Sequence, residues 1–407
     1  MTRDYPNYIH DLNCFKRETL EARMKVVGVK NIARMELFLW DLEIFLQLQK
    51  ILGEKLVLKG GAAVQFYLPI YEQRTSVDID MLFHGSLDEI QNALSQVEAR
   101  FPHENDLFIF HQYEPKQPKT KLPLYTYYLQ VPSVCTLRET RDSRDGQQRI
   151  KVEFITCLDQ IPIAKVPGDT IFAMESHEIY QVLPIDQLLA DKLTTLGPNT
   201  IGIQDDRMDE QVKQLYDIFL LLTHHYQSLS IDVIRLYYLV RAEAEAKDRG
   251  TLFDLAEIKS DTMVQLKRLR NLDDGSITSK QHWQYILDFI SLYASRSTIR
   301  TAADWVIVGE KLRLLMAIIL DTRLDISKLV QAEKIDQMLQ FDHLSGAEKG
   351  RQIASFREQF IKEYGDLTGI DPKILKGKRL NRIFWAVADL DNLDEIERFV
   401  EKGISLS

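Results

Sequence analysis

The sequence predicts an α+β protein, with a mixed sheet in an N-terminal head and an all-helical C-terminal region. Up to about residue 225, segments rich in β-branched and aromatic residues alternate with amphipathic segments. Beyond that point, apolar residues recur almost everywhere at helical spacing. A chain of 407 residues is also too long for one small domain. We therefore expect a head over residues 1–225 and a helical domain over residues 226–407.

The bulk composition is that of an ordinary globular protein. Hydrophobic residues make up 45% of the chain and charged residues 27%, and the formal net charge is −9. This charge argues against a chain coated in positive charge, although a local basic patch is compatible with it. Cys14, Cys135 and Cys157 show neither a disulfide framework nor metal spacing. We find neither a signal peptide nor an apolar run that would span a bilayer, and expect a cytoplasmic protein without membrane contact.

The head is predicted to alternate helices and strands. Apolar residues at helical spacing predict a long helix over residues 32–52, which Gly53 ends. A period of two predicts a strand over residues 77–83, and Ser86 opens an amphipathic helix over 87–100. The other predicted elements are helices over 15–26, 62–68, 185–196 and 210–222, strands over 55–59, 107–110, 124–131 and 149–155, and a hairpin turn at Asp145-Gly146.

The C-terminal region contains only helical patterns with weak separators, and no internal repeat or low-complexity linker. The helices are predicted over residues 231–247, 254–271, 280–295, 302–320, 326–340, 347–363 and 378–401.

The stretch from Lys59 to Phe83 carries the chemistry. Asp78 and Asp80 lie two apart on the predicted strand, so both side chains project from the same face. Neighbouring carboxylates repel each other unless a cation neutralises them, and Mg²⁺ is usually bound by one or two carboxylates plus substrate phosphates. We therefore predict that Asp78 and Asp80 hold Mg²⁺ (or Mn²⁺). The alternative is that both are solvated residues on an exposed strand face.

A glycine pair precedes this strand. Gly60 and Gly61 open the predicted short helix, where backbone amides lack intrahelical partners and a phosphate can approach closely. A phosphate-binding turn followed by Asp-x-Asp on a strand is the minimal apparatus for nucleotidyl transfer. In this interpretation the amides hold the β- and γ-phosphates of a nucleoside triphosphate.

The pattern from Lys59-Gly-Gly to Ser76-Val-Asp-Ile-Asp-Met81 resembles the AbiEii-type nucleotidyltransferases, the toxins of type IV toxin–antitoxin and abortive-infection systems. These enzymes belong to the polymerase-β-like nucleotidyltransferase superfamily, so the resemblance implies that fold for the head. The match covers about residues 35–225. Ala62 departs from it, because many relatives have Thr or Ser after the glycines.

A second block extends the resemblance. It consists of Leu189-Ala-Asp-Lys-Leu193, then Arg207, then Lys213-Gln-Leu-Tyr-Asp217, with Lys213-Gln214 in place of a more usual Arg-Asp. The resemblance implies that Lys192 contacts the nucleotide phosphates, that Lys59 and Arg207 belong to the nucleotide-binding set, and that Asp217 completes the site. From the residues alone, Lys192 and Asp217 could equally form a structural ion pair.

Two further residues have open alternatives. Glu153 shares a strand face with Lys151, so it is either a general base toward an attacking hydroxyl or the acidic partner in a solvated ion pair. Ser76 either orients the loop before the aspartates or is an ordinary turn serine.

Basic clusters and a histidine pair are weaker signals. Residues 116–121 and 373–379, the latter with Arg382 and Trp385, could grip an RNA backbone, or they are solvated faces. His224-His225 at a helix end is interpreted as a C-terminal cap and not as a metal site.

Together these patterns predict a magnesium-dependent nucleotidyltransferase that transfers NMP from an NTP to an acceptor hydroxyl. By resemblance, the acceptor is a tRNA 3′ end, the enzyme acts as a growth-arresting toxin in a phage-defence or antitoxin-controlled system, and a separately encoded antitoxin restrains it. The alternatives are an enzyme that modifies a small molecule or a protein, and an inactive relative that acts as a scaffold.

Overall fold

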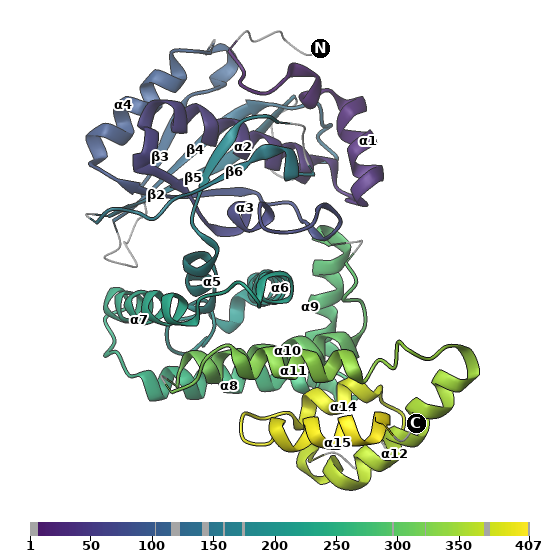
Figure 1. The fold of residues 1–407 in the computed structure, drawn as a ribbon. Helices are drawn as coiled ribbons and strands as arrows, with labels where there is room; N and C mark the ends of the chain where they lie inside the picture. The colour runs from purple at the N-terminus through teal and green to yellow at the C-terminus, as the bar shows by residue number, and fades with distance from the viewer. Residues whose placement is uncertain are drawn as a thin grey trace. The chain divides into compact units, whose positions relative to one another are not determined.

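A computed structural model describes most of the chain and divides it into two compact units, each of which we describe by itself (Figure 1). The first unit comprises Met1–Lys192, Arg241–Phe253 and Leu287–Thr298, and the second comprises Leu193–Val240, Asp254–Ile286 and Ile299–Ser407. The predicted domain boundary at residue 225 stays a prediction, because neither unit is continuous in sequence. The described residues are 7–101, 103–114, 123–140, 146–157, 159–172, 176–294, 297–321, 323–369 and 375–405.

The described strands of the first unit form one seven-stranded mixed sheet, as the predicted α+β class requires. The strand order is β3-β4-β5-β2-β1-β7-β6. The pairs β2–β5 and β1–β7 are parallel and the other pairs are antiparallel. The strands are β1 (Leu56–Leu58), β2 (Asp78–His84), β3 (Phe110–Tyr113), β4 (Leu124–Pro132), β5 (Gln147–Cys157), β6 (Ala164–Pro167) and β7 (Ile179–Val182).

The helix α2 (Ile32–Leu52) forms the centre of the first unit's core. Most of its residues are buried, and it contacts β1, β2 and β5 as well as α1 (Arg17–Val27) and α4 (Leu87–Glu98). The predicted ends are confirmed: α2 stops at Gly53, which has φ of +61°, and Ser86 caps α4 in a capping box.

Two predicted elements of the head differ in the structure, and two strands were missed. The short helix α3 (Gly60–Gln65) begins at the glycine pair itself, two residues before its predicted start. The strand predicted over 107–110 is wrong, because Asn105, Asp106 and Phe108 have positive φ and β3 begins only at Phe110. The strands β6 and β7 were not predicted, because four residues carry too little periodicity.

The second unit is built around α10, which lies against α6, α8 and α14 and is buried along most of its length. The single helix predicted over 378–401 is wrong. The backbone becomes extended at Ala388, and Asn392 closes a turn by accepting from the amide of Asp389 and donating to the carbonyl of Val387. The helices after α4 are α5 (Ile185–Leu193), α6 (Met208–His225), α7 (Ile231–Asp248), α8 (Leu255–Arg270), α9 (Ile277–Tyr293), α10 (Ala302–Ile319), α11 (Ser327–Met338), α12 (Gly346–Tyr364), α14 (Leu380–Val387) and α15 (Leu393–Ser405).

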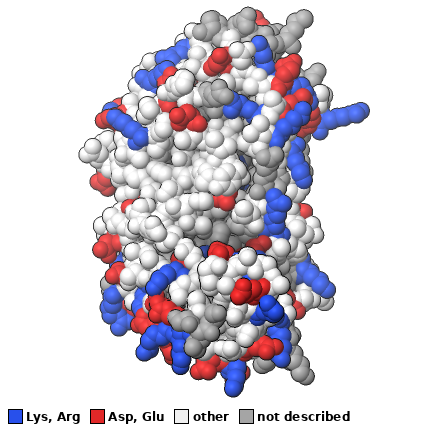
Figure 2. Space-filling model, turned by 45° about the vertical axis from the view of Figure 1, so that its right-hand side comes forward, with Lys and Arg blue, Asp and Glu red and all other residues white. Residues whose placement is uncertain are grey.

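The C-terminal basic cluster is partly internal, and its interpretation as an RNA grip stays a prediction. Arg382 and Trp385 are completely buried, whereas Lys376 and Arg379 are exposed and Lys373 lies outside the described residues. Lys378 Nζ lies 2.8 Å from a carboxylate oxygen of Asp273, and Arg382 Nη2 lies 2.9 Å from the other. The second predicted grip, over 116–121, lies outside the described residues. Figure 2 shows acidic and basic side chains interspersed over the face that it presents.

His224 and His225 occupy the last turn of α6, where a cation is favoured by the helix dipole. Within the described part of the chain, we find no helix that combines the length and apolar character needed to cross a membrane.

We predict that Gln65→Ala loosens the glycine turn. The Gln65 side chain is fully buried, donates to the carbonyl of Gly61 at 2.8 Å and accepts from the amide of Arg74 at 2.8 Å. Its loss removes the acceptor of the buried Arg74 amide, which costs about 1–3 kcal/mol. Faster amide hydrogen exchange at Arg74 and a lower melting temperature are expected. The exposed Gln227→Ala is the control, and equal exchange at Arg74 in both variants contradicts the prediction.

Candidate active site

The carboxylates Asp78 and Asp80 lie on one face of β2, in the middle of the sheet. In the parallel ladder with β5, Asp78 is opposite Lys151 and Asp80 is opposite Glu153. Both aspartates are half-buried, whereas Ile79 between them is completely buried on the other face. The strand therefore anchors itself with its apolar face and presents two carboxylates on the opposite one.

The glycine turn lies directly against Asp80. Gly60 has φ of +69°, and a Cβ atom added there would be 2.2 Å from Asp80 Oδ2. The amide of Lys59 also donates to the carbonyl of Asp80 at 2.9 Å. The turn and the carboxylate are thus joined through both backbone and side-chain contact, and only glycine fits at residue 60.

Arg74 and Ser76 lie on the other side of the turn. A Cβ atom added at Gly61 would be 2.8 Å from Arg74 Nη2 and 3.1 Å from Ser76 Oγ. Both side chains are buried, and Arg74 Nη1 donates to the carbonyl of Thr75 at 2.9 Å. Arg74 was not singled out from the sequence; its only signal was its place in the loop before Asp78, which does not distinguish a site residue from a loop cation.

The electrostatics of the turn favour a bound cation. Burial, together with the charges of Asp78 and Glu153, raises the pKa of Asp80 to about 7, although Lys59 and Lys192 act in the opposite direction. The carboxylate of Asp80 is therefore short of positive charge in spite of the two nearby lysines.

Glu153 is engaged within the sheet. Its Oε2 lies 2.5 Å from Lys151 Nζ, and Thr126 Oγ1 donates to its Oε1 at 2.9 Å. The ion pair that was one of the two predicted alternatives is thus formed. The role of Glu153 as a general base stays a prediction.

The two lysines of the predicted site lie close to it in the first unit. Lys59 Nζ is 3.0 Å from a carboxylate oxygen of Asp191 on α5, and Lys192 is the next residue of that helix and is buried. Asp217, which is completely buried, and Arg207, which pairs with Glu210, belong to the second unit. Their nucleotide-binding roles stay predictions.

Asp78 and Asp80 fit a hard divalent cation by their chemistry: two oxygen donors on one strand face, with the pKa of one of them raised by the other. Among the described residues there is no group of three or more His, Cys, Asp or Glu side chains placed to hold an ion. The pair therefore fits a metal that takes its other ligands from substrate phosphates and water, as Mg²⁺ commonly does.

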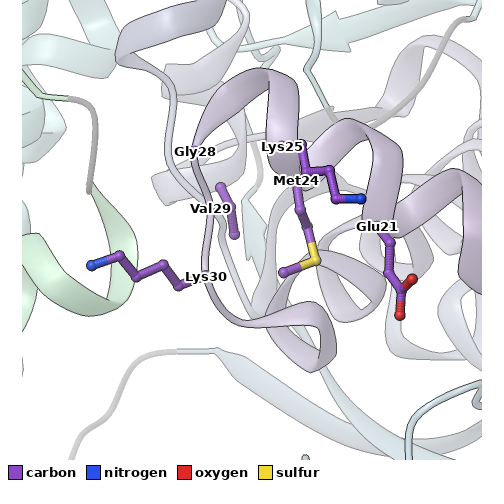
Figure 3. A pocket seen from close by; sticks show the side chains of 6 residues that line it. All are labelled: Glu21, Met24, Lys25, Gly28, Val29 and Lys30. Carbon is purple, nitrogen blue, oxygen red and sulfur yellow. The ribbon is translucent and has the colours of Figure 1, made fainter.

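A shallow hollow lies elsewhere in the first unit, at the C-terminal end of α1 (Figure 3). It shares no residue with the glycine turn or the carboxylates, and its volume is about 360 Å³. Its lining residues are Glu21, Met24, Lys25, Gly28, Val29 and Lys30.

A glycine turn held against a strand that carries two carboxylates could place a phosphate beside a divalent cation. A family model described as the nucleotidyl transferase AbiEii toxin of type IV toxin–antitoxin systems matches residues 45–305. The match covers more than half of the chain, so the chain belongs to the AbiEii nucleotidyltransferase toxin family. The predicted resemblance is confirmed.

Solved structures give weaker likenesses. JHP933 from Helicobacter pylori has a TM-score of 0.32 and 14% identity, over 63% of this chain and 91% of its own. MenT4, a nucleotidyltransferase toxin from Mycobacterium tuberculosis H37Rv, has a TM-score of 0.38 and 12% identity, over 75% of this chain and 99% of its own. These scores are too low to carry an argument. A comparison with curated proteins gave no match.

We predict that Gly60→Ala abolishes nucleotidyl transfer, because the new methyl group displaces the Asp80 carboxylate. A displacement of about 1 Å at reacting groups can lower a rate by roughly 100-fold, and we expect at least that loss. Gly53→Ala is the matched control: Gly53 also has positive φ, of +61°, but nothing lies within 4 Å of its added Cβ. It therefore costs stability, about 1–3 kcal/mol, and leaves activity intact. Equal activities of the two variants would contradict the proposed geometry.

Proposed function

We propose that this enzyme uses Mg²⁺ to transfer NMP from a nucleoside triphosphate to the 3′-terminal hydroxyl of a tRNA. The observation that carries the proposal is the direct contact between Gly60 and Asp80, which brings a phosphate-binding turn to a carboxylate pair. Membership of the AbiEii family supports the use of an NTP and the action as a toxin.

In this mechanism each group of the first unit has one task. Asp78 and Asp80 hold Mg²⁺ or Mn²⁺, which when bound neutralises phosphate charge and lowers the pKa of the attacking hydroxyl. The amides of Gly60 and Gly61, with Lys59 and Lys192, bind the phosphates. Ala62 offers no hydroxyl to them, so the backbone amides carry more of the binding.

The transfer itself is a displacement at the α-phosphorus. The acceptor oxygen forms a bond to that phosphorus, the bond to the bridging oxygen of the β-phosphate breaks, and pyrophosphate leaves. The hydroxyl proton passes to Glu153 or Asp217. Each oxygen of Glu153 already has one partner, Lys151 or Thr126, so the proton would go to a remaining lone pair of this carboxylate.

The biological setting follows from the family. Its model describes a toxin of a type IV toxin–antitoxin system. We therefore propose that addition of nucleotides to tRNA arrests growth in the cytoplasm, for instance during phage infection, and that a separately encoded antitoxin restrains the enzyme.

We predict that purified protein with total tRNA, Mg²⁺ and each α-labelled NTP in turn gives labelled RNA with one or more of them. Asp80→Asn should give at least about 100-fold less label, because it removes a predicted metal ligand. Periodate-oxidised tRNA, which lacks a free 3′ hydroxyl, is the control and should stay unlabelled. If the label appears on protein or on a small molecule and not on RNA, the acceptor is not a tRNA. If no arm shows transfer, the result favours an inactive scaffold.

We also predict that Mg²⁺ stabilises the enzyme more at pH 8 than at pH 5.5. The pKa of Asp80 is raised from 3.8 to about 7 in the folded state, so between these values the folded chain keeps a proton that the unfolded chain loses. Without metal, this group therefore lowers stability as pH rises through that window. Mg²⁺ replaces the proton, so the rise in melting temperature should grow with pH.

Asp80→Asn is the control for this measurement, because it removes the titrating group and leaves the other buried acids in place. Its Mg²⁺-induced shift should be small at both pH values. A wild-type shift that is equal at pH 5.5 and pH 8 would show that Asp80 is not the metal ligand.

A further inference from the structure

Arg241, on the part of α7 that belongs to the first unit, extends the charged cluster beside the glycine turn. Its Nε lies 3.5 Å from Asp191 Oδ1, on the same carboxylate that Lys59 contacts at 3.0 Å. Asp191 therefore links Lys59, the residue before the glycine pair, to α7, a helix that comes after the family motifs in the sequence.

The guanidinium of Arg241 is poorly satisfied. Its Nε is buried and has no hydrogen-bond partner in the described part of the chain. Its second acidic neighbour, Glu245 Oε1, is 4.0 Å from Nη2, which is an ion-pair distance without a hydrogen bond. A guanidinium has five N–H donors, and leaving them unused in a half-buried position is costly unless a ligand takes them.

Among the described residues, a buried guanidinium nitrogen without a hydrogen-bond partner also occurs in Arg23, Arg270, Arg357 and Arg382, but each of these donates from another nitrogen. Two arginines with extensive hydrogen bonds show the contrast with Arg241. Arg17 binds Glu139 through both Nη atoms, at 3.0 and 2.7 Å. Arg235 donates to four backbone carbonyls, of Ile318, Ile319, Asp321 and Leu324. Arg241 has neither a two-nitrogen ion pair nor a set of hydrogen bonds to carbonyls, although its side chain is only 18% exposed.

The charges around Arg241 favour an anion. Lys59, Lys192 and Arg241 all lower the pKa of the buried carboxyl of Asp191, so three cations share this one carboxylate. Glu245 is a second acid at the edge of the cluster, and burial raises its pKa. Three cations and two carboxylates thus meet beside the residue that precedes the glycine pair.

We propose that Arg241 binds the β- and γ-phosphates of the nucleoside triphosphate, and that Asp191 positions Arg241 and Lys59 for this contact. The inference rests on the proposed function, because it assigns a further residue to the same substrate. A planar guanidinium with spare donors suits a phosphate group, which accepts two parallel hydrogen bonds. The triphosphate is favoured over an RNA backbone because Lys59 ties the cluster to the glycine turn.

The test measures dissociation constants by titration calorimetry in the presence of Mg²⁺, with pyrophosphate as the probe because it needs no choice of base. Arg241→Gln should weaken pyrophosphate binding by about 10- to 100-fold, the loss expected for hydrogen bonds between charged groups. Arg241→Lys should restore part of the affinity, because it keeps the charge but not the fork of donors. Arg17→Gln removes an equal charge at a structural ion pair and should bind as wild type does.

A second variant should strengthen pyrophosphate binding, an effect that misfolding would not produce. Glu245→Gln removes a negative charge 4.0 Å from Arg241 and should tighten pyrophosphate binding by about twofold or more. AMP, CMP, GMP and UMP, which lack β- and γ-phosphates, should bind equally to wild type and Arg241→Gln. Asp191→Asn should raise the KM for NTP more than it lowers kcat.

The outcomes separate this inference from the proposed function. If wild type labels tRNA and Arg241→Gln still binds pyrophosphate as tightly, Arg241 is not a triphosphate residue and the function stands. If Arg241→Gln raises only the KM for tRNA, the guanidinium contacts the acceptor and the inference is overturned. If wild type neither binds pyrophosphate nor transfers a nucleotide, the proposed function itself fails.

Discussion

The close approach of Gly60 to Asp80 is the constraint on which the site depends. The turn passes so near the carboxylate that no side chain fits, and the amide of Lys59 fixes the register through the carbonyl of Asp80. A phosphate bound at the turn, as we propose, would therefore lie next to a metal ion bound by the carboxylates, and the backbone would not need to move. The remaining features, from the buried face of β2 to the bonds of Gln65, keep these two parts together.

The charges around this contact are partly sorted by sign. Asp78, Asp80 and Glu153 lie side by side on the sheet face, where Lys151 pairs with Glu153, whereas Lys59 and Arg241 meet at Asp191. Sorting of this kind costs stability, as the raised pKa of Asp80 shows, because like charges are held together out of water. In the proposed function, a divalent cation would lie beside the carboxylates and the triphosphate beside the cations, so each would offset the charge of the groups next to it.

The sequence was sufficient where structure is set locally. The long helix with its end at Gly53, the capping box at Ser86 and the two faces of β2 all follow from spacing and capping chemistry. Prediction from the sequence failed before β3, where residues with positive φ delay the start of the strand. It also failed at Asn392, whose hydrogen bonds close a turn inside a helical pattern. Arg74, Asp191 and Arg241 could not be found either, because their environment comes from residues distant in sequence.

The helical second unit shows that basic residues clustered in the sequence need not form an exposed basic surface. Asp273 holds Lys378 and Arg382 of its basic C-terminal cluster, and the almost completely buried Glu310 pairs with Arg270 and Arg313 at 2.8 Å each. These cations tie α8, α10 and α14 together, and breaking a buried pair to bind a phosphate would cost several kcal/mol, roughly 3–5. If the acceptor is an RNA, as proposed, cations outside such pairs would bind it, so the density of Lys and Arg in the sequence is a poor guide to the acceptor surface.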